Sequence, residues 1–310
     1  MEELFSALIP VTSLDGMSSP GIQCAVARLD LIHPYLSGNK LFKLWYYLEK
    51  YRNAASAENP PENSATPFTG IVTFGGAYSN HLLATAYTCH MLGIPCTGIV
   101  RGEAPVSPGP TLEDCARYGM KLHYVSRQAY KDPETVLRDL YAAPSAHPLP
   151  IPEGGAGEDG IRGAALICQK IPGIETFTHI LCAVGTGTTL SGIDRALLPG
   201  QSAIGIPVLR IPEGAQEGFS HSLGCSSRTR LLFGYAFGGY ARRDDELTEF
   251  MRTFYGTYGV PTDFVYTGKA AFALCDLVKQ RYFPSGSRIL LIHTGGLQGN
   301  RSLPSNILGF

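Results

Sequence analysis

Unbroken apolar runs alternate with longer amphipathic segments along most of the chain, and this alternation constrains the fold more than any other feature. The runs lie at 71–74, 96–100, 178–184 and 203–209 and from 288 onward, with helical patterns between them. A strand without alternating polar positions is covered on both faces, which is typical of parallel sheets flanked by helices. The sequence therefore predicts an α/β protein, and its 310 residues are enough for two lobes.

The same pattern places individual elements. We expect a strand over 24–32, a helix from about residue 40, and an exposed loop over 54–67, where small and polar residues accompany prolines. Thr111 and Asp114 have the spacing of a capping box, which predicts that a helix begins at this point.

The charge balance argues against a nucleic-acid partner. The chain has 25 Lys and Arg residues against 26 Asp and Glu residues, and no basic run is interleaved with aromatic residues. The N-terminal segment begins with acids where a secretory signal needs cations, and no apolar stretch approaches the roughly 20 residues of a membrane span. We therefore expect a cytoplasmic protein that does not enter the membrane.

The cysteine and histidine residues give little support for a metal centre. The chain has eight of each, but the cysteines form no CxxC pair and the histidines form no HExxH pair. Free thiols in a reducing cytosol fit this scatter better than disulfides or zinc ligands. We expect no metal site.

Three junctions between a predicted strand and the next helix are rich in glycine and hydroxyl residues. They cover 75–80 (GGAYSN), 185–189 (GTGTT) and 293–296 (HTGG). In parallel sheets such junctions lie at the carboxyl ends of strands, where ligands collect. The GTGTT loop could hold one phosphate, because glycine permits close backbone approach and amides at a helix start favour anions.

The same loop does not match the nucleotide-binding motifs. It lacks the lysine of a P-loop, and Leu190 stands where a dinucleotide fingerprint needs glycine. A single phosphate therefore fits better than a dinucleotide. For this loop alone, a purely structural turn is the alternative.

A lysine stands at the start of one predicted helix. At about 100° per residue, the apolar face of this helix comprises Leu41, Leu44, Leu48 and Tyr51. Lys40 lies at the border of that face, whereas Lys43 and Lys50 are expected to point well away from it. An amine in an apolar, electropositive setting is favoured in its neutral form, which can form a Schiff base. The alternative is a lysine that snorkels at a helix N-terminus.

Six short motifs occur in an order that resembles one enzyme family. They are SGNK at 37–40, GGxxSNH at 75–81, PEGG at 152–155, GTGTT at 185–189, VYTGKA at 265–270 and HTGG at 293–296. Over residues 24–299 the chain resembles the pyridoxal-phosphate enzymes of the 1-aminocyclopropane-1-carboxylate deaminase and D-cysteine desulfhydrase family. The resemblance implies the two-lobed fold type II, similar to tryptophan synthase β. It also implies a homodimer, a larger lobe formed by 1–42 plus 149–310, and a smaller lobe at 43–148.

The resemblance further implies roles for individual residues. Lys40 would carry pyridoxal 5'-phosphate as a Schiff base and move the Cα proton, and Asn80 would bond the phenolic oxygen of the cofactor. Ser79 would hold the carboxylate of a small amino-acid substrate, with Asn80 and His81 beside it, at a helix start where anions are favoured. The phosphate cradle would comprise Gly185, Thr186, Gly187, Thr188 and Thr189.

Two tyrosines and two threonines bear on the reaction. Tyr266 and Tyr240 match family tyrosines that project towards the substrate, with core aromatic residues as the alternative. Thr267 stands where the ring-opening deaminases carry a glutamate near the pyridine nitrogen, and Thr294 stands where they carry leucine. A neutral hydroxyl stabilises a protonated ring nitrogen less than a carboxylate does. The predicted activity is therefore β-elimination, with D-cysteine converted to pyruvate, sulfide and ammonia.

Other functions stay open. The nearest is 1-aminocyclopropane-1-carboxylate deamination to 2-oxobutyrate and ammonia, because both tyrosines are present. A non-catalytic protein that binds pyridoxal phosphate is an alternative of another class. A nicotinamide-dependent oxidoreductase is disfavoured, since the third glycine and an acidic ribose-binding residue are missing. Compared with many family members the chain differs at 37–38 and 41–43, and the role of 153–162, which carries three acids and one arginine, is open.

Overall fold

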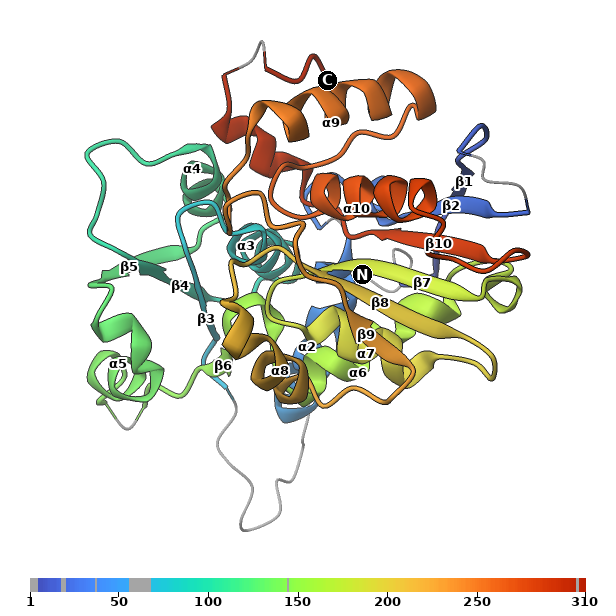
Figure 1. The fold of residues 1–310 in the computed structure, drawn as a ribbon. Helices are drawn as coiled ribbons and strands as arrows, with labels where there is room; N and C mark the ends of the chain where they lie inside the picture. The colour runs from blue at the N-terminus through green and yellow to red at the C-terminus, as the bar shows by residue number, and fades with distance from the viewer. Residues whose placement is uncertain (1–4, 18–20, 37, 56–67, 144, 305–306) are drawn as a thin grey trace.

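The computed structural model describes residues 5–17, 21–36, 38–55, 68–143, 145–304 and 307–310. They form two sheets (Figure 1), one of six strands in the order β1-β2-β10-β7-β8-β9 and one of four in the order β5-β4-β3-β6. The pair β1 and β2 is antiparallel and the remaining pairs are parallel. The expected α/β class with parallel sheets flanked by helices is confirmed.

The elements follow the alternation seen in the sequence. The larger sheet contains β1 (Val11–Ser13), β2 (Gln23–Arg28), β7 (His179–Val184), β8 (Ser202–Pro207), β9 (Thr229–Leu231) and β10 (Arg288–His293). The smaller sheet contains β3 (Ile71–Gly75), β4 (Cys96–Arg101), β5 (Lys121–Val125) and β6 (Leu149–Ile151). The helices are α2 (Asn39–Ala55), α3 (Asn80–Leu92), α4 (Pro110–Arg117), α5 (Pro133–Leu140), α6 (Glu158–Gln169), α7 (Thr188–Ala196), α8 (Glu213–Ser222), α9 (Asp245–Tyr258) and α10 (Thr267–Lys279).

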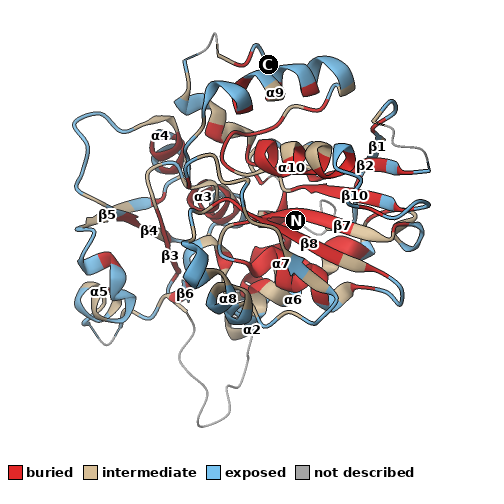
Figure 2. Cartoon of the chain, viewed as in Figure 1, coloured by how far each residue is buried: buried red, intermediate tan, exposed pale blue. Residues whose placement is uncertain are grey.

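Helices cover both faces of the larger sheet. In Figure 1, α9 and α10 lie on one face, and α2, α6 and α7 lie on the other. Figure 2 shows the consequence, because the central strands β2, β10, β7 and β8 are almost entirely buried while the outer surfaces of α8 and α9 are exposed. Burial on both faces is the reason these strands read as unbroken apolar runs.

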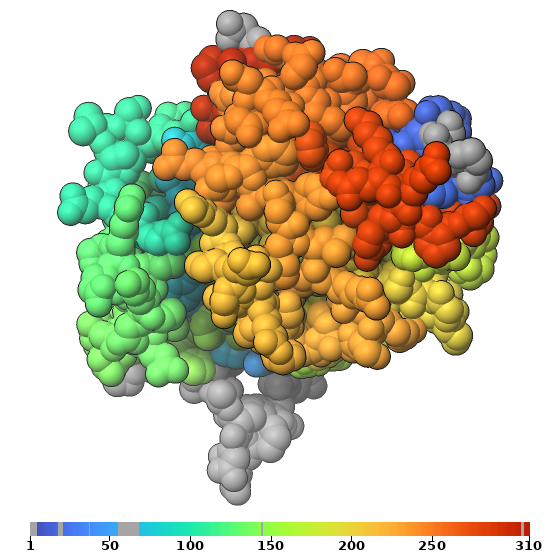
Figure 3. All heavy atoms as spheres, in the orientation of Figure 1, coloured from blue at the N-terminus to red at the C-terminus, as the bar shows by residue number. Residues whose placement is uncertain are grey.

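One apolar core joins the two sheets. It contains Ile71 of β3, Leu83 of α3, Leu44 of α2, Ile180 of β7 and Leu290 of β10, each almost fully buried. Removing this surface from water holds the sheets against each other. In Figure 3 the segment of the smaller sheet, coloured teal to green, forms one flank of the molecule beside the yellow and orange segments.

Two local predictions are wrong. The strand expected over 24–32 ends at Arg28, because Leu29–Leu31 turns into a short 3-10 helix. Helix α4 begins at Pro110 with Gly109 as its N-cap, so Thr111 lies within the first turn and the capping box does not form. Proline suits the first helical position, because its φ angle is already helical and its missing N–H would have no partner there.

The expected boundary at residue 149 is also displaced. Strand β6 pairs with β3 in the smaller sheet, so the segment belonging to that sheet extends through Ile151. The division into two lobes is otherwise still a prediction. The loop expected over 54–67 begins two residues later than predicted, because Ala55 ends α2, and residues 56–67 lie outside the described chain. The sequence pattern missed the short elements β1, β6, β9 and α8.

All eight cysteines are free thiols. In the part of the chain that the structure describes, no helix is both long and apolar enough to span a bilayer. Within the same residues, no group of three or more His, Cys, Asp or Glu side chains is placed to hold a metal ion.

Candidate active site

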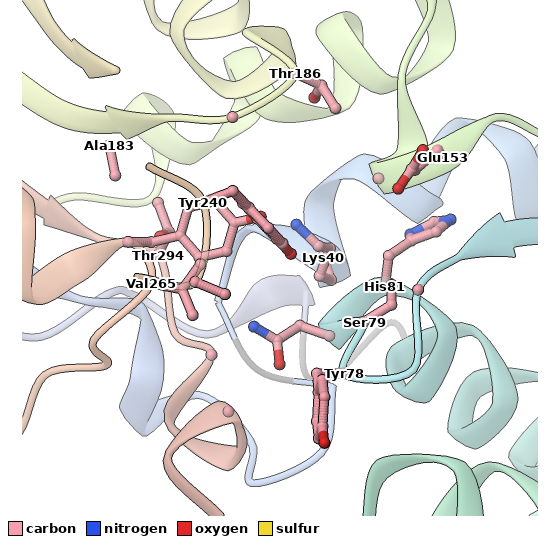
Figure 4. Close-up of a pocket in the computed structure, with 18 of the residues that line it drawn as sticks. Lys40, Tyr78, Ser79, His81, Glu153, Ala183, Thr186, Tyr240, Val265 and Thr294 are labelled. Atoms are coloured by element: carbon pink, nitrogen blue, oxygen red, sulfur yellow. The ribbon is translucent and has the colours of Figure 1, made fainter. Parts of the chain in front are cut away.

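A cavity of about 840 Å³ lies where strands of both sheets end. Its walls come from the segments that follow β3, β4 and β6 of the smaller sheet and β7, β8 and β10 of the larger one, together with the start of α2. All three glycine-rich junctions predicted from the sequence contribute to it. In Figure 4 the side chain of Lys40 lies between Tyr240 and the segment carrying Ser79 and His81.

Lys40 is positioned by the first turn of α2. The backbone N–H of Asn39 donates to the carbonyl oxygen of Thr294 at 3.3 Å, which joins the start of α2 to the end of β10. The Nζ of Lys40 donates to Oδ1 of Asn39 at 3.1 Å, and Nδ2 of Asn39 donates to Oγ1 of Thr189 at 2.7 Å. Burial lowers the pKa of Lys40 to about 8, although Asp263 acts in the opposite direction. About a fifth of this amine is therefore neutral near pH 7.4, far more than for a lysine in water, and the neutral form can act as a nucleophile.

Lys43 does not point away from the site as predicted. It is buried and lines the cavity, where its Nζ donates to the carbonyl oxygen of Gly154 at 3.1 Å. Burial and the nearby Lys40 hold its pKa well below the ordinary value. The face of α2 that carries Lys43 is covered because α6 approaches closely: a Cβ at Gly163 would lie 2.0 Å from the carbonyl oxygen of Phe42. The run of glycines in the 153–162 segment and at Gly163 is the sequence signal that could have revealed this contact.

The loop before α7 presents backbone amides to the cavity. Gly187 is the N-cap, has a φ of +83°, and offers no side chain to the first turn. A Cβ on Gly187 would lie 2.2 Å from Cδ2 of Leu223, so only glycine fits this position. Thr186 and Thr189 line the cavity, whereas Thr188 is buried behind them, with its hydroxyl hydrogen-bonded to that of Thr186 at 3.0 Å. Free amides at a helix start form a site for an anion.

The start of α3 provides a second set of polar groups. Ser79 is the N-cap, and its Oγ accepts a hydrogen bond from the backbone N–H of Leu82 at 3.2 Å. The hydroxyl proton of Ser79 is not used in this contact and can still be donated. Asn80 lines the cavity, and its buried Oδ1 has no hydrogen-bond partner among the described residues. A buried acceptor of this kind indicates a hydrogen-bond donor that a bound ligand would supply.

His81 lines the same wall. Thr73 donates its hydroxyl proton to the carbonyl oxygen of Ile151 at 2.8 Å, so it accepts from Nε2 of His81 at 2.7 Å. Nδ1 of His81 is then an unprotonated acceptor, and it has no partner among the described residues. Burial, with Lys40 and Lys43 nearby, lowers the pKa of His81 well below its ordinary value. A neutral His81 cannot attract a carboxylate by charge.

Tyr240 and Tyr266 meet above the cavity. Their hydroxyl oxygens are 3.4 Å apart and their rings are edge to face, with centroids 5.9 Å apart. Burial is the main reason that the pKa values of both tyrosines are raised. The pKa of Tyr266 lies well above the ordinary value. Both hydroxyls therefore keep their protons near neutral pH and can donate them.

The two threonines behave differently. Thr294 lines the cavity. Thr267 is almost fully buried behind the lining residues, donates to Oδ1 of Asp263 at 2.6 Å, and accepts from the backbone N–H of Asp263 at 2.7 Å. The hydroxyl of Thr267 thus helps to hold the start of α10, and its place beside the cofactor ring stays a prediction.

Within the 153–162 segment, the acids have separate roles. Glu153 lines the cavity, whereas Glu158 pairs with Arg195 and Asp159 lies 3.6 Å from Arg162. Arg101, which the sequence reasoning missed, lines the cavity at the carboxyl end of β4. Its position at the end of a parallel strand is the signal that could have identified it.

These groups fit pyridoxal 5'-phosphate. The cavity offers an amine with a lowered pKa at Lys40, free amides behind Gly187 for a phosphate, and an unpartnered buried amide oxygen at Asn80. Gly296 is also required, because a Cβ there would lie 2.7 Å from Nδ2 of Asn80. An aldehyde that carries a phosphate and polar ring substituents matches this donor set.

Comparison with known proteins agrees with this chemistry. A protein of Pyrococcus abyssi named "Putative 1-aminocyclopropane-1-carboxylate deaminase" is 28% identical over 90% of this chain and 86% of its own length. A Pyrococcus furiosus protein of the same name is 28% identical over 99% of this chain and 95% of its own length. The solved structure described as an "ACC deaminase homologue" has a TM-score of 0.80 and 26% identity, covering 99% of this chain and 94% of that one.

A more distant structure shares the fold. A pyridoxal 5'-phosphate-dependent aspartate racemase has a TM-score of 0.68 at 16% identity, covering 93% of this chain and 90% of that one. The family described as "Pyridoxal-phosphate dependent enzyme" matches residues 7–295. The cofactor predicted from the sequence is thereby confirmed, and this chain belongs to the pyridoxal-phosphate dependent enzymes of fold type II.

Proposed function

We propose that this enzyme removes ammonia from a small amino acid by β-elimination, with D-cysteine as the leading substrate. The observation that carries the proposal is the amine of Lys40, which burial brings to a pKa of about 8 within the cavity that joins both sheets. A base with a pKa near the working pH both accepts and returns a proton efficiently.

The chain's own residues would divide the work as follows. Lys40 would carry the cofactor and move the proton at Cα, and the first turn of α3 with the hydroxyl of Ser79 would orient the substrate carboxylate. Tyr240 and Tyr266, both protonated, would donate to the departing group. The bound cofactor supplies the electron sink that makes the Cα proton removable.

The charge around the cavity favours a good leaving group. Among the described residues that line the cavity, the only acid is Glu153, which follows β6 on the side of the smaller sheet. The carboxylate of Asp263 lies outside the lining residues, and its two oxygens accept from Thr267 and from the backbone N–H groups of Val265 and Tyr266. A cofactor ring without a carboxylate partner would be a weaker electron sink, sufficient for expelling thiolate.

Ring opening of 1-aminocyclopropane-1-carboxylate is the second candidate. The names of the two Pyrococcus relatives, which align with at least 90% of this chain, favour it, as does the pair of tyrosines at the cavity. Both candidates remove a proton and release ammonia, so the products distinguish them.

The deciding experiment compares the two substrates with the purified, cofactor-loaded enzyme. Under the first proposal, D-cysteine yields sulfide and pyruvate at a kcat/KM at least about tenfold above that for 2-oxobutyrate formation from the cyclopropane amino acid. The reverse ratio would replace the first candidate by the second. No product from D-cysteine, L-cysteine, β-chloroalanine or the cyclopropane compound would favour a non-catalytic cofactor-binding protein.

The identity of the cofactor-bearing lysine has its own test. Lys40 and Lys43 are matched, since both line the cavity with lowered pKa values. We expect Lys40→Met to abolish the borohydride-stable attachment of pyridoxal phosphate, while Lys43→Met keeps it, as peptide mapping of the reduced adduct would show. Attachment in Lys40→Met at the wild-type level would refute the assignment.

We also keep a homodimer and a cytoplasmic location as predictions. Light scattering on the eluted protein would test the first, and cell fractionation would test the second.

A further inference from the structure

Lys269 is a buried cation that the proposed reaction does not use. It is fully buried in the first turn of α10, and its Nζ donates to the carbonyl oxygens of Ala236 at 2.8 Å and Gly239 at 2.7 Å. Burial lowers its pKa to about 8, with Asp263 and Asp244 acting in the opposite direction. Burying an amine is unfavourable unless its hydrogen bonds are made, so these two contacts are essential to its placement.

The two carbonyls belong to the first residues of two successive hydrogen-bonded turns. The backbone N–H of Gly239 donates to the oxygen of Ala236 at 2.9 Å, and that of Arg242 donates to the oxygen of Gly239 at 3.1 Å. Tyr240 is the second residue of the second turn, directly after Gly239. One side chain, that of Lys269, thus holds the first carbonyl of both turns.

The backbone of this segment is strained. Phe237 and Ala241 have φ angles of +48° and +53°, in the left-handed region that residues with a side chain rarely adopt. Gly238 and Gly239 between them are also left-handed, at +83° and +118°. Such a conformation persists only where the surroundings determine it.

We propose that Lys269 is the positioning residue for Tyr240. Lys269 lies three residues after Tyr266 and contacts the turn that carries Tyr240, so its side chain links the two segments whose tyrosine hydroxyls are 3.4 Å apart over the cavity. Without the amine, the strained turns relax and Tyr240 leaves its place above the substrate. The kinetic part of this inference rests on the proposed function, whereas the conformational part does not.

The conformational test uses hydrogen exchange in the cofactor-free protein. We expect Lys269→Met to raise the exchange rate of the amides of Gly239 and Arg242 at least about tenfold, because local opening frees them. The matched control is Lys279→Met, which removes an exposed lysine at the end of the same helix and leaves these amides unchanged. Unchanged exchange in a folded Lys269→Met variant overturns the proposal. If that variant does not fold by circular dichroism, Lys269→Leu, which is smaller and also lacks an N–H donor, is measured by the same criterion.

The kinetic test is a double-mutant cycle with Tyr240→Phe. In the wild-type background we expect Lys269→Met to lower kcat about 100-fold, as misplacement of a working group by about 1 Å does, with little change in cofactor affinity. Lys269→Arg keeps donors for both carbonyls and retains more activity than Lys269→Met. In the Tyr240→Phe background, Lys269→Met has almost no further effect on kcat, because both substitutions remove the same contribution, that of the Tyr240 hydroxyl.

The outcomes separate this inference from the proposed function. Equal losses in both backgrounds would show that Lys269 acts on the whole fold and would overturn the positioning role. A wild-type enzyme that converts none of the tested amino acids would remove the proposed function, while the exchange measurement would still decide the role of Lys269.

Discussion

Helices α3 and α7 both begin at the cavity, and they differ in what their first turns already contact. At α3 the N-cap Ser79 accepts from the backbone N–H of Leu82, so part of the first turn is satisfied from within. At α7 the N-cap is Gly187, and no side chain caps the turn. Both helix starts carry the positive end of a helix dipole, but only α7 leaves all of its first amides for a ligand.

This difference indicates which anion each helix start suits. A phosphate has several strong acceptor oxygens and can use the uncapped amides of α7, whereas a carboxylate needs fewer donors and can share the first turn of α3 with Ser79. Lys40 is linked to both: Asn39 joins it to Thr189 of α7, and its charge adds to the effect of burial in lowering the pKa of His81 in α3. We therefore propose that the start of α7 binds the cofactor and the start of α3 binds the substrate.

The largest expected effect comes from placing a side chain at the N-cap of α7. Gly187→Ala strains the backbone at a φ of +83° and places a Cβ 2.2 Å from the Cδ2 of Leu223, so either the Leu223 side chain turns aside or the loop moves and carries its amides with it. We expect about 2 to 3 kcal/mol of lost binding free energy, which is a roughly 30- to 150-fold rise in the Kd for pyridoxal phosphate, measured by absorbance titration.

Gly200→Ala is the matched control for this change. Gly200 has the same φ of +83° but nothing within 4 Å of its Cβ position. It therefore reports backbone strain alone, and cofactor affinity stays at the wild-type value. If both variants bind the cofactor equally, the α7 start is not the phosphate site.

The pH dependence of cofactor attachment tests the pKa of Lys40, the residue linked to both helix starts. Only the neutral amine attacks an aldehyde, and the pKa of Lys40 is lowered to about 8. The rate of attachment should therefore rise about tenfold per pH unit below this value and level off above it.

Two comparisons make this measurement specific. Pyridoxal, which lacks the phosphate, excludes a contribution from phosphate ionisation. Free Nα-acetyl-lysine has an ordinary pKa, so its rate continues to rise towards about pH 10. A protein rate that follows the free lysine would show that burial does not shift this amine.

The smallest expected effect comes from the α3 start. Ser79→Ala removes the cap and the hydroxyl donor, so we expect about 1 kcal/mol lower stability and a five- to tenfold higher KM, with cofactor affinity unchanged. Denaturant unfolding and steady-state kinetics measure the two quantities.

Asp132→Ala is the matched control, since Asp132 caps α5 by accepting from Thr135 at 3.2 Å and does not line the cavity. This variant should melt at a lower temperature with an unchanged KM. If Ser79→Ala and Asp132→Ala have the same KM, Ser79 acts only as a structural cap and does not bind the substrate.

The long elements could be predicted because buried positions require apolar residues, which form a recognisable pattern in the sequence. Strands β7 and β10 are covered on both faces and therefore appear as apolar runs. Strands β1, β6 and β9 have three residues each, which is too short for a periodic signal. Helix α8 has no buried residue, so its sequence has no apolar face from which the helix could be predicted.

The site was predictable where a motif combines backbone and side-chain requirements, as in the GTGTT loop and at Lys40. It was not predictable where the environment comes from distant segments. Lys43 is buried by the close approach of α6, and Thr267 turns to Asp263, neither of which follows from a helical wheel. Lys269 gave no signal, because a lysine in an apolar helix normally reads as a surface residue.

The strand order also bears on how the chain is made. The strands of the smaller sheet all lie between residues 71 and 151, so that sheet can form early in synthesis. Strand β10 lies between β2 and β7 in the larger sheet, yet it follows every other described strand in the sequence. Until β10 has been made, β2 and β7 have no strand to join them, so the cofactor cavity, which includes residues that follow β10, can form only afterwards.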